Sequence, residues 1–314
     1  MRILFITQSR IGDAVLTTGL LNHLAEIYPR ARFTVACGVV PAPLFEPMPF
    51  VERVIPMIKR RRAGHWRDLW RTVAGTWWSM VVDLRGSALA WTVPTLRRRV
   101  LRSSWDAKHR LVHMSSVIGR DTPFPPRLWN TPEQEAEAAR RVPSGPPVLA
   151  LGPTANWSPK QWPAERFARL AACLTAANGR FPGARVAVLA AASERAAAQP
   201  VLDSLPAGQA IDLVGTVDLP TTHACLKRCA LYIGNDSGLM HIAAASGVPT
   251  LGLFGPSSEV FYGPWGPRCA SVRGPRGFED ICWAPDFDHR KSDCLMLDLT
   301  VDMVLDAVQG LISA

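Results

Sequence analysis

Hydrophobic and polar positions along the chain follow one another in the order of strand, loop and helix. Residues 2–7 form a short apolar run, residues 8–13 interrupt it, and residues 14–28 carry leucines at every fourth position. This change of spacing is typical of a strand followed by an amphipathic helix. Pro29 predicts the end of the helix and residues 32–36 a second strand. The chain therefore opens with a βαβ unit, which predicts a parallel sheet.

A second alternating series follows a proline-rich segment. Seven prolines lie between residues 121 and 147, around one short helical stretch near 132–142. We place a domain boundary there, with an N-terminal domain at 1–145 and a C-terminal domain at 146–314. The last helix could pack back on the N-terminal domain.

Further strands are predicted at 54–55, 80–84, 148–151, 185–190, 211–214, 230–233 and 249–254, and further helices at 163–178, 193–203, 220–229, 237–246 and 300–312. Two βα series predict an α/β protein of two facing Rossmann-like domains with parallel sheets and the ligand in the cleft between them.

The composition narrows the class of protein. The chain has 314 residues, of which 48% are hydrophobic and 19% charged, as expected for a globular protein with real cores. No apolar run reaches the roughly 18 to 20 residues of a membrane span, and residues 1–6 are too short for a signal peptide, so we expect the protein to stay in the cytosol. Seven cysteines without a dense framework predict free thiols.

Positive charge is concentrated in one window of the chain. Residues 59–110 hold thirteen Lys and Arg against three Asp, a local excess of +10, while the whole chain carries +9. The same window contains six tryptophans, namely Trp66, Trp70, Trp77, Trp78, Trp91 and Trp105. A basic surface with aromatic residues suits nucleic acid, an anionic lipid headgroup or a phosphorylated glycan. The alternative is a solvated helical face above core tryptophans.

The strongest local motif is residues 232–241, YIGNDSGLMH, which lead from a strand into a helix. Asp236 or Ser237 can cap this helix, while the backbone N–H groups of Ser237 and Gly238 point outward at the positive end of its dipole. Such a helix start is suited to phosphate. His241 follows Ser237 by four residues, so its imidazole could reach a bound diphosphate or a sugar hydroxyl. An ordinary capped helix with a packed histidine is the alternative.

A second motif occupies residues 152–163, GPTANWSPKQWP, between a predicted strand and a predicted helix. Loops at the carboxyl ends of strands are where α/β sheets bind ligands, and the ammonium of Lys160 suits a phosphate. Ser257 and Ser258 follow another strand on the same sheet edge. A solvated lysine beside packing tryptophans is the alternative for Lys160.

The third motif is Gly12-Asp13, at the first strand-to-helix turn. Asp13 could simply cap the following helix. Its other possible role is that of a general base, which takes a proton from an attacking hydroxyl.

Metal and nucleotide signatures of other classes are weak or missing in the sequence. Asp286 and Asp288 form an Asp-x-Asp pair, a pattern that can hold a divalent ion on a nucleotide diphosphate, but they lie in a tail loop. Cys269, Cys282 and Cys294 are too widely spaced for a confident zinc site. The motifs of P-loop, hydrolase and typical dehydrogenase enzymes do not occur. We therefore expect no metal site and no cofactor.

Taken together, these motifs resemble the bacterial heptosyltransferases of lipopolysaccharide synthesis, glycosyltransferase family 9, over nearly the whole chain. The similar blocks are RILFITQSRIGDAVLTTGLLNHLAEIYPRA at the start, VDLRG at 82–86, NWSPKQWPAERFARLA from Asn156, GNDSGLMHIAAASGVPTLGLFGP from Gly234 and CLMLDLTVDMV from Cys294. The resemblance implies the GT-B fold, with acceptor binding in the N-terminal domain and nucleotide-sugar binding in the C-terminal domain. Arg10 and the region near Cys282 depart from common family sequences.

Roles for individual residues follow from this resemblance. Asp13, next to Gly12, is expected to be the catalytic base, and Lys160 to contact the donor diphosphate. The remaining donor-site residues are Thr154, Asn156, Glu194, Asp236, Ser237, Gly238 and His241, with Glu194 near the ribose. The resemblance further implies a metal-independent, inverting transfer of heptose from ADP-heptose to a lipid-linked anionic glycan of the lipopolysaccharide core. We expect peripheral contact with the cytoplasmic face of the inner membrane and no nucleic acid partner.

Three other functions are compatible with the sequence. A related transferase could use a different donor sugar or acceptor. A binding protein could use the same scaffold without catalysis, in which case Asp13→Asn would leave its function intact. A nucleic-acid-binding protein would bind mixed-sequence DNA or RNA with an affinity that falls steeply with salt.

Overall fold

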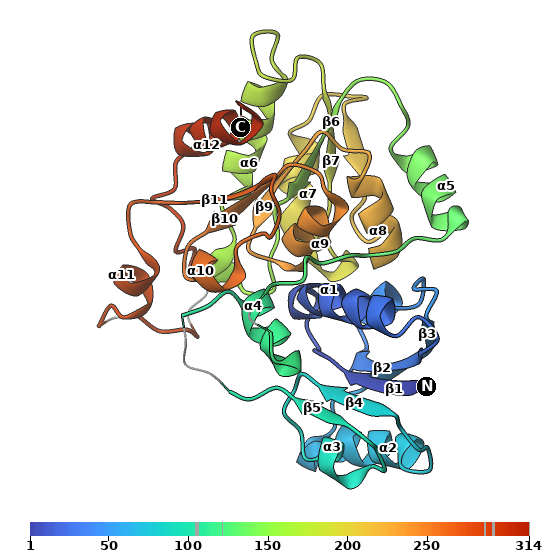
Figure 1. Cartoon of the computed structure of the whole chain (residues 1–314). Coiled ribbons are helices and arrows are strands. Elements are labelled where there is room, and N and C mark those ends of the chain that lie inside the picture. Colours follow the sequence, from blue (N-terminus) through green and yellow to red (C-terminus); the bar gives the residue numbers. More distant parts are fainter. Residues whose placement is uncertain (104–106, 121, 286, 291–292, 314) are drawn as a thin grey trace. The chain divides into compact units, whose positions relative to one another are not determined.

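The computed structural model describes residues 1–103, 107–120, 122–285, 287–290 and 293–313. Contacts between residues divide the chain into two compact units, Met1–Thr131 and Pro132–Ala314. Each unit is built around one parallel sheet (Figure 1). The expected α/β class with two Rossmann-like parallel sheets is therefore confirmed. The boundary drawn from the sequence between residues 145 and 146 lies farther along the chain, and as a boundary between folding domains it stays a prediction.

The first sheet has the strand order β3-β2-β1-β4-β5, and all neighbouring strands are parallel. The chain runs outward from β1 to β3 and then continues on the other side of β1. At such a topological switch point, the carboxyl ends of the two central strands open a crevice between their loops. The strands are β1 (Arg2–Ile6), β2 (Arg32–Gly38), β3 (Val51–Met57), β4 (Met80–Asp83) and β5 (Arg98–Val100).

Helices cover both faces of this first sheet, with α1 on one side and α2 and α3 on the other (Figure 1). Since both faces are covered, β1 and β4 are apolar along almost their whole length. Leu69 and Val73 of α2 pack with Leu4 and Val81 in a buried cluster. The helices are α1 (Ile11–Ile27), α2 (Gly64–Val73), α3 (Leu89–Thr92) and α4 (Arg110–Ser115), with short 3-10 turns at Ala42–Leu44, Arg61–Ala63 and Ser116–Ile118.

Part of the proline-rich segment packs across α1. A Cβ atom at Gly19 would lie 2.1 Å from the carbonyl oxygen of Phe124, so a glycine is needed for this close approach. The Asn22 amide donates to the carbonyl of Arg127 at 3.0 Å and accepts from the indole of Trp129 at 2.8 Å. This stretch therefore belongs to the first unit and does not hang between the units as a free linker.

The second sheet has the strand order β11-β10-β9-β6-β7-β8, again parallel throughout. The chain runs from β6 outward to β8 and then returns to β9 on the other side of β6. A second topological switch point therefore lies between β6 and β9. The strands are β6 (Val148–Gly152), β7 (Arg185–Val188), β8 (Ala210–Asp212), β9 (Leu231–Asn235), β10 (Thr250–Phe254) and β11 (Cys269–Arg273).

The helices of the second unit enclose its sheet. Side chains of α6, α7 and α12 join those of β6, β7, β9 and β10 in one buried cluster that includes Trp162 and Phe167. On the other face, α8 contacts α9 and α5. Helix α12, on the same face as α6, also contacts β11. The helices are α5 (Pro132–Arg141), α6 (Ala164–Thr175), α7 (Arg195–Asp203), α8 (Leu219–Leu226), α9 (Gly238–Ser246), α10 (Glu259–Tyr262), α11 (Phe278–Cys282) and α12 (Val301–Ser313), with 3-10 turns at Ser158–Lys160 and Ala192–Glu194.

The predicted strand and helix series of both units is confirmed, with shifts of a few residues at the ends. The first helix begins at Ile11 rather than Ala14, because Ile11 and Gly12 already have helical conformation. The strands β5 and β11 and the helices α2, α3, α4, α10 and α11 were not predicted from the sequence. Within the described ranges, every helix is too short or too polar to cross a membrane.

Candidate functional site

The second switch point brings two predicted motifs together. Lys160 ends the 3-10 turn in the loop of residues 153–161 that follows β6, which we call the Lys160 loop. Asp236 follows β9 directly. The Lys160 ammonium donates to the Asp236 carboxylate at 2.5 Å, and the two side chains are 21% and 8% exposed. A largely buried ion pair therefore bridges the crevice where α/β sheets bind ligands.

The start of α9 borders this ion pair. Ser237 is the N-cap residue with an extended backbone, but its side chain accepts no capping hydrogen bond from the helix. Ser237 therefore occupies the predicted cap position, but the predicted side-chain capping bond is not formed. The Asp236 carboxylate accepts from Lys160 instead. Ser237 and Gly238 are half-buried, while His241, one turn further, is only 4% exposed. The first turn of α9 leaves backbone N–H groups and the positive helix end available to an anion.

Glycines at the ends of two adjacent strands make room for a large side chain beneath the site. A Cβ atom at Gly152 would lie 2.2 Å from the Tyr232 hydroxyl, and one at Gly234 would lie 2.4 Å from it. Tyr232 is fully buried, and burial raises its pKa. The Tyr232 hydroxyl therefore keeps its proton, and the side chain fills the space beside Gly152 and Gly234 at the switch point.

A second polar connection joins the loops after β6 and β7. The Thr154 hydroxyl donates to the Glu194 carboxylate at 2.8 Å, and the backbone N–H of Ala191 donates to the same oxygen at 3.1 Å. Asn156, also on the Lys160 loop, is exposed. The structure thus brings Thr154 and Glu194 to the carboxyl edge that carries Lys160 and Asp236.

In the first unit, Asp13 and Gly12 lie at the carboxyl edge of the sheet, in the first turn of α1. Arg10 is the N-cap residue, so the alternative in which Asp13 caps the helix is wrong. The Asp13 carboxylate is half-buried in a turn where the helix dipole favours negative charge. Across the switch point, the Gln8 side chain donates to the carbonyl of Leu84 at 2.9 Å and ties the loops after β1 and β4 together.

The end of β4 holds two residues whose roles the sequence motif did not reveal. The buried Asp83 carboxylate accepts from the backbone N–H of Arg85 at 2.8 Å and from the Ser87 hydroxyl at 2.6 Å. The Arg85 guanidinium lies 4.7 Å from the centre of the Trp66 ring. Burial lowers the pKa of Arg85, and the charge of Asp83 acts in the opposite direction. Asp83 therefore shapes the loop that presents Arg85.

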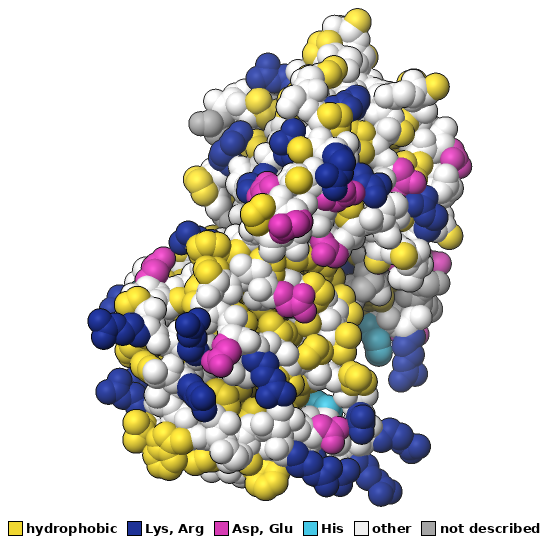
Figure 2. Space-filling model, turned by 90° about the vertical axis from the view of Figure 1, so that its right-hand side faces the viewer, with side chains coloured by type: hydrophobic (Ala, Val, Ile, Leu, Met, Phe, Trp, Pro, Cys, Tyr) yellow, Lys and Arg dark blue, Asp and Glu magenta, His cyan; other side chains and the backbone are white. Residues whose placement is uncertain are grey.

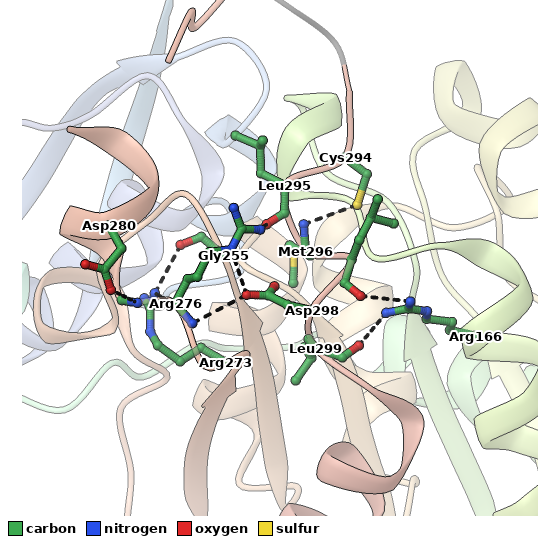
Figure 3. Close-up of polar contacts among 12 residues, drawn as sticks. Arg166, Gly255, Arg273, Arg276, Asp280, Cys294, Leu295, Met296, Asp298 and Leu299 are labelled. Carbon is green, nitrogen blue, oxygen red and sulfur yellow. Dashed lines mark hydrogen bonds and ion pairs between the residues drawn. The ribbon is translucent and has the colours of Figure 1, made fainter. Parts of the chain in front are cut away.

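Arginines organise the loops after β10 and β11, a feature without a recognisable sequence signal (Figure 3). The Arg273 guanidinium donates to the carbonyl oxygens of Gly255 at 3.3 Å and Ser257 at 2.7 Å and pairs with Glu259. Arg276 pairs with Asp298 at 2.9 Å. Although burial acts in the opposite direction, the hydrogen bond and charge of Arg276 lower the pKa of Asp298.

Metal-ligating candidates are not gathered in the described part of the chain. Asp286 lies outside the described residues, and the carboxylate of Asp288 accepts from the backbone N–H of Arg290 at 2.9 Å. Among the described residues, no group of three His, Cys, Asp or Glu side chains is arranged to hold a metal ion. The expectation of free thiols is confirmed for all seven cysteines.

Two parallel Rossmann-like sheets, with a Lys160–Asp236 ion pair at the switch point of the second, are the architecture of the GT-B fold. Residues 114–280 match the model of "Glycosyltransferase family 9 (heptosyltransferase)", and the chain belongs to this family. It is similar to lipopolysaccharide heptosyltransferase 2 of Salmonella typhimurium, with 26% identity, covering 100% of this chain and 99% of the relative. Lipopolysaccharide heptosyltransferase 1 of Pseudomonas aeruginosa is 28% identical over 85% of this chain and 82% of its own length.

Solved structures agree with the fold. The ADP-heptose lipopolysaccharide heptosyltransferase II of E. coli matches with a TM-score of 0.78 and 22% identity, covering 100% of this chain and 99% of that one. A family 9 glycosyltransferase of Veillonella parvula matches with a TM-score of 0.82 and 20% identity over 99% and 97% of the two chains. The recognised family and the GT-B fold predicted from the sequence are confirmed.

Proposed function

We propose that this glycosyltransferase transfers heptose from ADP-heptose to an acceptor of the lipopolysaccharide core. The observation that carries the proposal is the Lys160–Asp236 ion pair beside the uncapped start of α9, at the switch point of the second sheet. Its relatives are lipopolysaccharide heptosyltransferases, and a similar E. coli heptosyltransferase was solved with ADP. The Lys160 ammonium and the N–H groups at the start of α9 match a donor with a diphosphate leaving group.

Departure of ADP requires stabilisation of the negative charge that develops on the diphosphate. Lys160 and the N–H groups at the start of α9 supply fixed positive charge and hydrogen-bond donors at one place, without rearrangement during the reaction. Ser237, Gly238 and His241 belong to the same helix start, and Thr154 and Asn156 to the neighbouring loop. Glu194, held by Thr154, is assigned to the ribose. These groups would let the transfer proceed without a metal ion.

Asp13 acts in this proposal as the general base, with Gly12 beside it. Its carboxylate takes the proton of the acceptor hydroxyl as that oxygen forms a bond to the anomeric carbon and the bond to ADP breaks. One displacement of this kind inverts the configuration at the anomeric carbon. The position of Asp13 at the carboxyl edge of the first sheet supports the role.

The first unit is assigned to a lipid-linked, anionic glycan acceptor at the cytoplasmic face of the inner membrane. Four large apolar side chains near the amino ends of β4 and β5 are exposed, among them Trp77 at 63%, Trp91 at 66% and Leu96 at 69%. The fourth, Trp70, donates to the carbonyl of Thr92 at 3.4 Å. The Arg98 guanidinium lies 5.8 Å from the Trp91 ring centre. Arg71, Arg97 and Arg99 are neighbours of these residues in the sequence.

Figure 2 shows hydrophobic and basic side chains together over the lower part of the first unit. Aromatic side chains mixed with arginines favour the interface of an anionic bilayer. This supports a peripheral contact of the first unit with the membrane that carries the acceptor.

The test is a transfer assay with ADP-heptose and heptose-deficient lipopolysaccharide core, with and without EDTA. We expect release of ADP, unchanged rates in EDTA, and a product of inverted anomeric configuration by NMR. Release of another nucleotide from another nucleotide sugar would keep the transferase and replace the donor. ADP-heptose binding without transfer to any core acceptor would favour a non-catalytic binding protein, and strict Mg²⁺ dependence would contradict the metal-independent mechanism.

A further inference from the structure

Residues 294–299, which we call the strap, lie between α11 and α12 and contact the Lys160 loop. The backbone N–H of Leu295 donates to the carbonyl of Pro159 at 3.1 Å. The Cys294 thiol donates to the carbonyl of Gln161 at 3.1 Å. Burial raises the pKa of Cys294, so the thiol keeps its proton at neutral pH. The two hydrogen bonds therefore fix the backbone on both sides of Lys160.

The strap is held in place by α6. The Arg166 guanidinium donates to the carbonyl oxygens of Leu299 at 2.6 Å and Leu297 at 2.9 Å (Figure 3). The buried Trp162 indole donates to the same Leu299 oxygen at 2.8 Å. Since hydrogen bonds from a charged donor are stronger than those between neutral groups, Arg166 is the principal anchor on this side.

On its other side, the strap packs against the loops that follow β10 and β11. A Cβ atom at Gly255 would lie 2.4 Å from the Met296 side chain, and one at Gly274 would lie 2.5 Å from the Asp298 carboxyl carbon. Both glycines therefore allow an approach that a larger residue would block. With the Arg276–Asp298 pair, these contacts fix the strap from the side opposite to Arg166.

The Lys160 loop has a second, independent anchor at β9. The Asn235 side chain accepts from the backbone N–H of Trp162 at 3.1 Å and donates to the carbonyl of Pro153 at 2.8 Å. Asn235 thus holds the residues at both ends of the loop, and the strap holds Pro159 and Gln161 on either side of Lys160. A lysine side chain has many rotamers, so its contribution to phosphate binding depends on where its backbone is held.

We propose that the strap is a positioning element for the donor phosphates and that Arg166 and Cys294 are positioning residues acting through Lys160. The inference rests on the proposed donor site at Lys160. It adds that the strap, which is distant in sequence from the Lys160 loop, sets the affinity of the donor site for a diphosphate.

The experiment is a double-mutant cycle on the full chain, with the dissociation constant for ADP measured by calorimetry. Arg166→Met keeps the aliphatic stem and removes the two bonds to the strap. We expect it to weaken ADP binding by about fivefold in the natural background, a coupling of the size typical for residues in one network, and by less than about twofold in the Lys160→Ala background. Cys294→Ala should weaken binding by about twofold, and Cys294→Ser, which keeps a donor, should restore it.

Arg228→Met is the matched control, because Arg228 also donates to a carbonyl, that of Val142 at 2.6 Å, but near the amino ends of the strands. It should change the melting temperature without changing ADP affinity. Equal weakening by Arg166→Met in both backgrounds would overturn the proposal and leave the strap a purely structural element. If Lys160→Ala itself left ADP affinity unchanged, the proposed donor site would fail and the positioning role with it.

Discussion

The carboxyl edges of the two parallel sheets hold their charged side chains in different ways. In the second unit, Lys160 is paired with Asp236 and Glu194 with Thr154, so these side chains fix one another. In the first unit, Asp83 is bonded to backbone N–H groups and a serine, and Arg85 lies on the Trp66 ring. At the second edge the charged side chains therefore pair with other side chains, whereas at the first edge the half-buried Arg85 has a ring contact and, among the described residues, no ion pair. This difference suits a fixed diphosphate donor on one unit and an anionic, lipid-linked acceptor on the other.

The largest expected effect separates chemistry from donor binding. Asp13→Asn removes the base but keeps the size of the side chain, so the transfer rate should fall by about 10²–10⁴-fold while ADP affinity stays within about twofold. The measurements are an ADP-release assay and calorimetry. Asp218→Asn is the control, because Asp218 starts α8 and asparagine caps helices equally well. A fully active Asp13→Asn enzyme would remove Asp13 from the mechanism.

The second prediction tests how much the Lys160–Asp236 ion pair contributes to the stability of the second unit. Lys160→Met leaves the buried Asp236 carboxylate without its cation, so the free energy of unfolding should fall by about 2 kcal/mol, and adding Asp236→Asn should recover roughly half of it. Urea unfolding measures both. Lys227→Met, which breaks an exposed pair with Glu135, should cost about 0.5 kcal/mol or less. Equal losses of unfolding free energy at the two pairs would show that the Lys160–Asp236 pair contributes no more to stability than an exposed pair.

Most strands and loops of the two parallel sheets were predictable from the sequence. The central strands are continuous apolar runs between polar loops, and the glycine-rich start of α9 and the Lys160 loop both follow such strands. The edge strands β5 (Arg98–Val100) and β11 were missed, since Arg98 and Arg99 make β5 read as a loop. That Lys160 and Asp236 lie at one sheet edge was predicted, because both follow parallel strands of one sheet. Their ion pair was not predicted.

Other features depend on tertiary contacts that local sequence does not encode. The contacts of Arg166 with the strap join residues more than a hundred positions apart, and the carbonyl groups involved exist at every residue. The first turn of α1 looked like a loop because Gly12 has a low helix propensity, which moved the expected cap to Asp13.

The third prediction concerns how the stability of the second unit depends on pH through the buried His223. His223 in α8 is buried, and burial together with the charge of Lys227 lowers its pKa to about 4. In the unfolded chain this imidazole takes up a proton near its ordinary pKa, so the unfolded state binds more protons and stability falls as the pH drops from about 6.5 toward 4. The loss due to His223 should be about 2 kcal/mol at pH 5. Unfolding curves of the natural protein and His223→Gln at pH 7.5 and pH 5 measure it, and parallel losses would contradict it.

The smallest expected effect concerns the exposed aromatic surface of the first unit. Trp77→Ala and Trp91→Ala should each reduce partition into vesicles of phosphatidylglycerol and phosphatidylcholine by about fivefold, because each removes apolar area that can enter the interface. Sedimentation with the vesicles measures it. Trp283→Ala is the matched control in the second unit, since Trp283 is 71% exposed. Binding that all three variants leave unchanged would exclude this surface as the membrane contact.

The nucleotide specificity of the Lys160–Asp236 edge tests the proposed donor site most directly. Calorimetric titration of the natural protein and of Lys160→Ala with ADP, UDP, GDP and CMP tests it. We expect ADP to bind in preference to the others and to lose about 10–100-fold in affinity in Lys160→Ala, because a hydrogen bond from a charged group is lost. Binding of ADP that is indifferent to Lys160→Ala, or no binding of any nucleotide, would contradict the assignment of this edge as the donor site.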